Sequence, residues 1–486
     1  MILLKNLWLI VTVLLLVLGN CSFGMAQWAG VELPAVTGAY GVGTVVLPMV
    51  DPGRPGMYVD GSSSKHREFM TQIWYPANKG VDGPKSTYTD EATAEYWLKA
   101  INTPGVDKNI RFQIKTHAVV GAQVVAGHER FPVVIFSPGL GTSYFLYQSI
   151  LEDVASHGYI VVGVNSPNSA LTSFPDGHIR VASDSEDEVE ESKYNQEAAD
   201  DLTFVVNHLR ELDNNSDLPF AGRVDFKRVG CFGHSFGGAA SIQTGIQSSQ
   251  VAAAIDFDGS VWGEAYKRPI SKPMMLVGTA RGDMTLDVVW GNLPKGSYKV
   301  AVNDSAHLSF SDYILIARSM GIYQPDQNDN SNPMDATRAI RITRDLVRTF
   351  FDTTLKHANP NQINRIGAKY PEVKVEEKLL SVSSVMAAPN FVLLYSKGDV
   401  SAYLDQESVT YDGTIIDSWL KLNISNKSYV VNYLFNTETK QMKAVKQRIY
   451  DSNNSKFKEE SVNQEWESID KDNMILYDKL LKKVKK

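Results

Sequence analysis

A serine stands between glycines where an apolar run gives way to a stretch of small residues. The hexapeptide Gly233-His234-Ser235-Phe236-Gly237-Gly238 follows the run 228–232 and precedes the small-residue stretch 238–247. A strand, a sharp turn and a helix in that order expose a serine hydroxyl for attack on a carbonyl carbon. Only residues without a Cβ tolerate the crowding that such a turn imposes on its flanking positions. We therefore predict that Ser235 is the nucleophile of an acyl-transfer reaction.

A serine hydroxyl is a weak nucleophile, so it needs a histidine that accepts its proton and an acid that orients that histidine. In strand–turn–helix sites of this kind the chain order is serine, acid, histidine. His307 comes soon after the apolar run 298–302, in a loop position suited to a base. His357 follows a long helical stretch and fits a helix C-terminus better. We predict that His307 is the base.

Two aspartates compete for the role of the acid. Asp258 follows the apolar run 252–257 and precedes Gly259, which allows a turn that presents a carboxylate at the end of a strand. Asp256 lies two residues earlier and points to the same face, where it would be a buried carboxylate that accepts backbone hydrogen bonds. We prefer Asp258, because a loop position can reach the histidine, and keep Asp256 as the rival.

The oxyanion of a tetrahedral intermediate needs two backbone N–H donors. One belongs to the residue after the nucleophile, Phe236, and the other to a loop that follows an earlier strand. The segment Ser137-Pro138-Gly139-Leu140-Gly141 leaves the apolar run 131–136 with two glycines that let the backbone turn. We predict the amides of Leu140 and Phe236 as the oxyanion hole.

The rest of the composition excludes several other classes of protein. A formal net charge of −7, with no dense basic run except at the C-terminus, argues against nucleic-acid binding. Neither a metal-ligand cluster nor a phosphate-binding loop appears, and Gly139-Leu140-Gly141 lacks the third glycine of a dinucleotide fingerprint. We therefore expect neither a metal nor a cofactor.

Short apolar runs alternate with helical stretches over residues 27–370, which predicts an α/β domain with a mostly parallel sheet covered by helices. Together with the serine turn, this pattern predicts the α/β-hydrolase fold. Helices are expected over 197–212, 238–247 and 335–355. Strands are expected over 71–75, 131–136, 159–164, 228–232, 252–257, 273–278 and 298–302.

Beyond residue 370 the composition and the hydrophobic pattern of the sequence change. A polar, then Val/Ser/Ala-rich stretch over 371–387 predicts a linker. Alternating strands over 388–486, with a hairpin formed by 428–435 and 441–451, predict a small β-rich domain that ends in a helix over 470–483.

The first residues predict export from the cytoplasm. Lys5 is followed by an apolar run over 7–18 that is too short to span a bilayer, so we interpret residues 1–26 as a signal peptide. Two processing routes fit, cleavage after Ala26 or lipidation of Cys21, and Asn20 favours cleavage because lipoproteins prefer a small residue there. We expect a secreted, periplasmic or cell-envelope protein.

The catalytic part resembles the platelet-activating-factor acetylhydrolase family of the plasma or isoform II type, as a bacterial relative. The matching features cover residues 30–355, in the family's order. They are Ile73-Trp74-Tyr75-Pro76, Phe136-Ser137-Pro138-Gly139-Leu140-Gly141, Ala155-Ser156-His157-Gly158-Tyr159-Ile160-Val161, Gly233–Gly238 and Ala306-His307-Leu308-Ser309-Phe310.

This resemblance implies a calcium-independent serine esterase that removes short or oxidised sn-2 acyl groups from phospholipids. It implies the triad Ser235, Asp258 and His307. An ester or phospholipid is the expected substrate, and a membrane surface or the envelope is a candidate contact. Pro138 and the segment Asn165-Ser166-Pro167 depart from the animal enzymes, which leaves the lipid specificity open. The C-terminal part resembles the surface-adhesin protein E-like domain through Tyr403-Leu404-Asp405, Ser408-Val409 and Ser418-Trp419-Leu420-Lys421, which implies attachment or partner binding.

Two other functions fit the same residues. A general short-chain or polyester esterase, or a serine peptidase, would use the same catalytic groups with a different acyl pocket. An inactive envelope-binding protein would instead rely on the C-terminal domain, although the complete set of catalytic residue types argues against it.

Overall fold

The computed structural model describes two compact units, each considered by itself. The first extends through Glu377, and the second contains the chain from Lys378 onward together with the described parts of 264–271 and 287–297. The described residues are 28–101, 106, 108–183, 185, 187–261, 265, 269–279, 289–324, 334–378, 391–397, 400–405, 409–411, 414–424, 427–450, 457–461 and 465–468.

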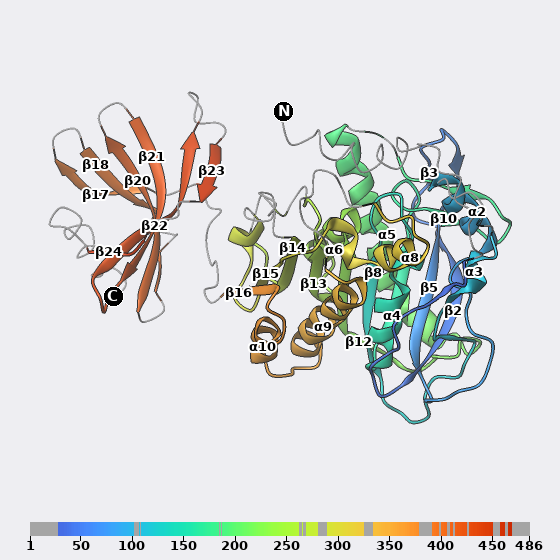
Figure 1. The fold of residues 1–486 in the computed structure, drawn as a ribbon. Coiled ribbons are helices and arrows are strands. Elements are labelled where there is room, and N and C mark those ends of the chain that lie inside the picture. The colour runs from blue at the N-terminus through green and yellow to red at the C-terminus, as the bar shows by residue number, and fades with distance from the viewer. Residues whose placement is uncertain are drawn as a thin grey trace. The chain divides into compact units, whose positions relative to one another are not determined.

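A ten-stranded sheet forms the centre of the first unit (Figure 1). In spatial order its strands are β16 (Val373–Glu377), β15 (Tyr298–Val302), β14 (Met274–Thr279), β13 (Val251–Phe257), β12 (Val224–His234), β8 (Phe131–Ser137), β9 (Ile160–Asn165), β5 (Arg67–Ala77), β2 (Gly41–Asp51) and β7 (Val119–Val120). The strands from β15 to β9 in this order are parallel, whereas β16 and β5 run antiparallel to their neighbours β15 and β9.

Helices cover this sheet and bury it. Strands β8 and β9 are buried along their whole length, as strands covered on both faces must be. The ring of Phe232 contacts Phe136 of the neighbouring strand and Phe351 of a covering helix. The principal helices are α4 (Gln148–Ser156), which packs beside α9 (Ala336–Leu355), and α5 (Glu188–Asn214), which packs beside α6 (Phe236–Gln247).

Shorter elements complete the first unit. They are β1 (Val31–Glu32), β3 (Gly56–Met57), β4 (Ser63–Ser64), α2 (Glu91–Ala100), α3 (Ile110–Gln113), β6 (Ile114–Lys115), η2 (Tyr144–Tyr147), β10 (Thr172–Ser173), β11 (Ile179–Arg180), η4 (His307–Phe310), α8 (Tyr313–Ser319) and α10 (Asn361–Lys369).

The predicted α/β class and the mostly parallel sheet are confirmed, and each expected strand is present. Strand β2 was not expected, because two glycines and Pro48 interrupt its apolar pattern, and Pro rarely occurs within a strand.

The expected linker over 371–387 is wrong in its first part. Residues Val373–Glu377 form strand β16, which pairs with β15 and closes one edge of the sheet.

The second unit contains an eight-stranded antiparallel sheet, which confirms the expected small β-rich part. Its expected hairpin is present as β21 and β22. The helix expected over 470–483 lies outside the described residues. The strands are β17 (Phe391–Lys397), β18 (Val400–Asp405), β19 (Thr410–Tyr411), β20 (Ile415–Ile424), β21 (Lys427–Asn436), β22 (Gln441–Tyr450), β23 (Phe457–Ser461) and β24 (Glu467–Ser468).

The expected signal peptide and Cys21 lie outside the described residues. Among the residues that are described, no helix has the length and apolarity to cross a membrane. Cys231 is buried in β12, and this burial raises the pKa of its thiol to about 12. A thiol of that kind is an unreactive part of the core.

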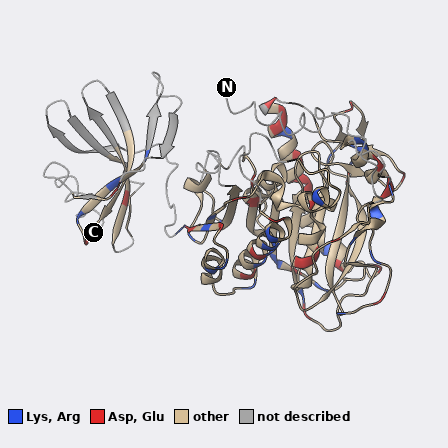
Figure 2. Ribbon diagram, in the orientation of Figure 1, with Lys and Arg blue, Asp and Glu red and all other residues tan. Residues whose placement is uncertain are grey.

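Charged residues are interspersed along the first unit, and red and blue segments alternate over its helices (Figure 2). This distribution agrees with the absence of a long basic segment in the described sequence.

Candidate active site

The predicted site residues follow strands that end at the same edge of the sheet. Strands β8, β12, β13 and β15 all run parallel, so their carboxyl ends lie on one side. The segments that leave these ends carry Leu140, Ser235, Asp258 and His307. In open α/β sheets the chemistry is concentrated at this edge.

Ser235 occupies a strained backbone conformation between β12 and α6. Its φ is 55° and its ψ is −126°, a combination that non-glycine residues rarely adopt. The turn is held by its own hydrogen bonds: Ser235 N–H donates to the carbonyl of Phe257 at 2.7 Å, and Gly238 N–H donates to the carbonyl of Ser235 at 2.9 Å. The nucleophile candidate therefore stands on a fixed strand–turn–helix corner, as its sequence context predicts.

Two glycines, Gly233 and Gly237, allow the tight turn between β12 and α6. A Cβ at Gly233 would lie 2.2 Å from the carbonyl oxygen of Gly237, and a Cβ at Gly237 would lie 2.2 Å from the carbonyl oxygen of Ser137. No side chain fits at either position, because real Cβ contacts are never this short. The second contact brings the start of α6 directly against the end of β8.

Asp258 and His307 meet across the site. Asp258 Oδ2 lies 2.7 Å from His307 Nδ1, and the other carboxylate oxygen accepts the backbone N–H of Thr279 at 3.1 Å. Asp258 leaves the strand with a φ of 55°, and its own N–H donates to the carbonyl of Val277 at 2.7 Å. Burial would raise the pKa of Asp258, but the contacts with His307 and Thr279 prevail and lower it.

The structure separates the two competing aspartates. Asp256 is fully buried within β13, and its Oδ1 accepts the backbone N–H of Gly259 at 3.1 Å. It therefore supports the turn that presents Asp258, whereas Asp258 itself reaches the histidine.

The competing histidine, His357, is exposed just beyond the end of α9, where its φ of 58° matches a left-handed helix C-terminus.

His234 links the serine turn to the His307 loop. Its side chain is buried, with Nε2 2.8 Å from the backbone carbonyl of His307 and Nδ1 2.8 Å from the hydroxyl of Tyr147. A carbonyl can only accept, so Nε2 carries the proton and Nδ1 accepts from the tyrosine. Burial, and next the imidazole of His307 at 4.5 Å between ring centroids, lower the pKa of His234 to about 3 and keep this ring neutral.

Tyr147 extends this link to the loop after β8. Its hydroxyl accepts the backbone N–H of Gly139 at 3.3 Å, and the ring packs on Phe136. Burial raises the pKa of Tyr147 to about 12, so it remains a donor to His234. The role of Tyr147 was not predicted from the sequence, since a lone tyrosine at the start of a helical stretch is most often part of the core.

The segments expected to form the oxyanion hole lie beside the serine turn. A Cβ built on Gly139 would lie 3.4 Å from the Cβ of Ser235. In the turn that follows, Thr142 N–H donates to the carbonyl of Gly139 and Gly141 N–H donates to the carbonyl of Ser169. The N–H of Leu140, just before Gly141, has no acceptor among the described residues. Phe236 is the first residue of α6, directly after Ser235.

Asp312 anchors the chain that follows His307. Its carboxylate accepts the backbone N–H of Ser149 at 3.1 Å and also the Ser149 hydroxyl, while its own N–H donates to the carbonyl of Leu146 at 2.6 Å. Burial raises the pKa of Asp312 to about 7. No sequence pattern singled this residue out, because its role depends on the packing of α4 against the His307 loop.

Among the described residues, no group of three or more His, Cys, Asp or Glu side chains is arranged to hold a metal ion. The groups gathered at the sheet edge are instead a serine, an imidazole–carboxylate pair and backbone amides. This set can perform nucleophilic acyl transfer with the protein's own residues.

Comparisons with known proteins identify a family and several related proteins. A family model described as platelet-activating factor acetylhydrolase, isoform II, matches residues 25–211 and 204–367. A probable 1-alkyl-2-acetylglycerophosphocholine esterase of Arthroderma benhamiae is 25% identical over 267 residues, 50% of this chain and 65% of that protein. The platelet-activating factor acetylhydrolase of Bos taurus is 26% identical over 320 residues, 58% of this chain and 68% of that protein.

A solved structure is similar over a larger share of the chain. The ferulic acid esterase from Streptomyces cinnamoneus superposes with a TM-score of 0.62 and 29% identity, over 72% of this chain and all of that one. This chain spans 65% of the length of the fungal relative, just under two thirds. The family model spans well over half of the chain, and this protein therefore belongs to the platelet-activating factor acetylhydrolase, isoform II, family, with an α/β-hydrolase fold.

Proposed function

We propose that this protein is a serine carboxylic-ester hydrolase in which Ser235, His307 and Asp258 act as a catalytic triad. The observation that carries the proposal is the 2.7 Å contact between Asp258 and His307, in a loop that His234 ties to the strained turn of Ser235. Family membership and the likeness to a solved esterase support the same reaction class.

In the first half of the reaction, the Ser235 hydroxyl attacks the ester carbonyl carbon and His307 Nε2 accepts its proton. Asp258 holds Nδ1–H and stabilises the imidazolium that forms. The amides of Leu140 and Phe236 donate to the oxyanion of the tetrahedral intermediate. Collapse of the intermediate transfers the proton to the leaving alkoxide and leaves an acyl group on Ser235.

In the second half, His307 removes a proton from water, which attacks the acyl group on Ser235. The same amides stabilise the second oxyanion, and collapse of the intermediate returns the proton to Ser235 and releases the acid. His234 does not compete for this proton, because burial lowers its pKa to about 3. Only one of the two neighbouring imidazoles therefore becomes charged during turnover.

For the substrate, we propose short or oxidised sn-2 acyl groups of phospholipids. The acetyl group in the names of the matched family and of the fungal and bovine relatives supports a short acyl chain. A second candidate is a simpler soluble ester. The likeness to the ferulic acid esterase favours it, since that structure is matched over its whole length and at a higher identity than the two phospholipid-ester relatives.

Replacement of the nucleophile tests the reaction class. We expect Ser235→Ala to lower the hydrolysis of p-nitrophenyl acetate by about 10⁴-fold or more, because no other group can carry the acyl intermediate. A fluorophosphonate probe should label the wild-type protein at Ser235 and leave the variant unlabelled. Undiminished hydrolysis by the folded variant would refute the assignment, and failure of the wild-type protein to react with the probe would favour a non-enzymatic binding role.

The two aspartates give a matched pair of variants. Asp258→Asn should lower kcat by about 10⁴-fold, because the amide cannot hold His307 in the tautomer that accepts a proton. Asp256→Asn keeps an oxygen for the N–H of Gly259 and should change kcat by less than about 10-fold. The steady-state kinetics of both variants decide the assignment, and a larger loss in Asp256→Asn would reverse it.

A substrate panel separates the two candidate esters. Relative kcat/KM values would be measured for an sn-2 acetyl phospholipid, its long-chain analogue, methyl ferulate and p-nitrophenyl butyrate. We expect the acetyl phospholipid to exceed its long-chain analogue by about 10²-fold or more, as a short acyl pocket requires. Preference for methyl ferulate over both lipids would instead support the simpler esterase.

We also propose that the chain is exported, on the evidence of its first 26 residues alone. The intact mass of protein isolated from its native host should correspond to a chain that begins at Gln27. A mass that requires lipid on Cys21 would establish the alternative route, whereas a full-length chain that retains Met1 in the cytoplasm would contradict export.

A further inference from the structure

An ion pair lies buried between strand β5 and helix α5. Arg67, the first residue of β5, and Asp201 of α5 have side chains that are 3% and 0% exposed. Arg67 Nη2 donates to Asp201 Oδ2 at 2.8 Å, and Arg67 Nε lies 3.2 Å from Oδ1. Burial of two charges costs solvation free energy, so a pair of this kind is weak evidence for stability alone. Its other contacts indicate a further role.

The same guanidinium holds the loop that follows β9. Arg67 Nη2 also donates to the backbone carbonyl of Pro167 at 2.8 Å. This contact follows from topology: β5 is antiparallel to β9, with Met70 opposite Asn165, so the first residue of β5 lies just beyond the end of β9. Arg67 therefore fixes the start of this loop at the edge of the sheet where the candidate active site lies.

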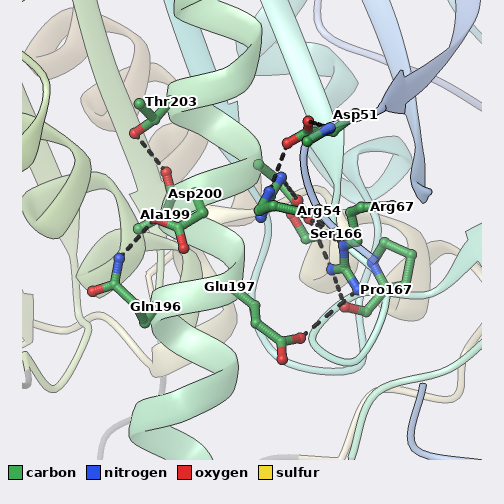
Figure 3. A network of polar contacts seen from close by, with 12 residues as sticks. Asp51, Arg54, Arg67, Ser166, Pro167, Gln196, Glu197, Ala199, Asp200 and Thr203 are labelled. Carbon is green, nitrogen blue, oxygen red and sulfur yellow. Dashed lines mark hydrogen bonds and ion pairs between the residues drawn. The ribbon is translucent and has the colours of Figure 1, made fainter. Parts of the chain in front are cut away.

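The next residue of the loop is fixed to the same helix. Asn168 is 1% exposed and has a φ of 76°. Its side-chain amide donates to the carboxylate of Glu197 in α5 at 2.9 Å and to the carbonyl of Met57 at 2.7 Å. Glu197 in turn lies 3.7 Å from Arg67 Nη1 (Figure 3). Two consecutive loop residues, Pro167 and Asn168, are therefore bonded to one cluster of charged side chains.

Beyond Asn168, the loop holds the turn that contains Leu140. The carbonyl of Ser169 accepts the N–H of Gly141 at 2.9 Å, and Leu171 N–H donates to the carbonyl of Thr142 at 2.8 Å. Both hydrogen bonds join backbone to backbone. A shift of the loop would therefore move the turn, and with it the direction of the Leu140 N–H.

Helix α5 also contacts the second oxyanion segment. The side-chain amide of Asn195, which is 4% exposed, donates to the backbone carbonyl of Phe236 at 2.9 Å. Residues Asn195, Glu197 and Asp201 thus connect one helix to the segments of both predicted oxyanion donors.

We propose that Arg67, clamped on Asp201, is a positioning residue that sets the geometry of the oxyanion hole through the loop 167–171. The inference rests on the proposed esterase function. In this proposal, helix α5 fixes the position of the Leu140 turn relative to the Phe236 turn. Because a misplacement of about 1 Å can cost about 10²-fold in rate, loss of this clamp should weaken transition-state binding more than substrate binding.

The chain offers a matched control in Arg54. Arg54 Nη2 donates to the same carboxylate, Asp201, at 2.6 Å, and its Nε donates to Asp51. Among the described residues, Arg54 makes no hydrogen bond or ion pair with the loop 167–171. Arg67→Met leaves Asp201 paired with Arg54, and Arg54→Met leaves it paired with Arg67. Both variants lose one arginine from the same acid, and only the first loses the hydrogen bond to Pro167.

The experiment compares both variants in kcat, KM, thermal midpoint and affinity for an alkylboronic acid, whose tetrahedral adduct with serine places an oxygen in the oxyanion hole. For Arg67→Met we expect kcat and boronate affinity to fall together by about 10-fold or more, with KM within about threefold of wild type. For Arg54→Met we expect both quantities near wild type. Equal kcat and equal boronate affinity in the two variants would overturn the inference.

Two further variants keep the outcomes distinguishable. If Arg67→Met does not fold, Arg67→Lys retains a positive charge at Asp201 without the planar fork that also reaches Pro167. A folded Arg67→Lys variant with wild-type kcat and boronate affinity would also overturn the inference, whereas a parallel loss of both supports it. Ser235→Ala, measured alongside, reports on the proposed function itself: its failure to abolish hydrolysis would refute the esterase and not the clamp alone.

Discussion

The close approach of helix α6 to the carboxyl end of strand β8 is the constraint on which the site depends. A Cβ at Gly237 would lie 2.2 Å from the carbonyl oxygen of Ser137, so only glycine allows the helix to begin where it does. Ser235, at the turn before this helix, has a φ of 55° and a ψ of −126°, a combination that non-glycine residues rarely adopt. Hydrogen bonds to neighbouring strands offset the strain, because Ser235 and Asp258 both donate their N–H groups to carbonyls at the ends of adjacent strands. The serine and the acid are therefore positioned by one sheet edge.

Buried polar side chains next to this sheet edge connect its loops through individual hydrogen bonds. Tyr147 donates to His234, and His234 donates to the backbone carbonyl of His307, the proposed base. Such a chain works only while His234 is neutral, and its burial, which lowers the pKa to about 3, ensures this. Asp258 has the opposite requirement, since its contacts with His307 and Thr279 stabilise its charged form. Burial and hydrogen bonding thus assign different charge states to groups a few ångströms apart.

The sequence predicted most of this arrangement where local pattern and chemistry coincide. The glycines around Ser235 and the apolar runs before Asp258 and His307 are local signals, and they identified the strands that bring these residues to one edge. Residues that act through packing gave no such signal. Tyr147 and Asp312 look like ordinary core and helix-start residues until α4 is placed beside the His307 loop. Strand β16 was interpreted as linker because its alternation of valine with charged residues spans only five residues, and its pairing with β15 depends on the rest of the sheet.

The central claim is that Ser235 forms a covalent acyl intermediate. A slowly deacylating ester, p-nitrophenyl dimethylcarbamate, tests it most directly, because the carbamoyl group remains on the nucleophile long enough for peptide mass spectrometry. The account predicts release of one equivalent of p-nitrophenol, loss of esterase activity in parallel, and a single carbamoyl group on the peptide that contains Ser235. Loss of activity with the carbamoyl group on another residue, or turnover of simple esters by protein whose Ser235 is fully carbamoylated, would contradict it.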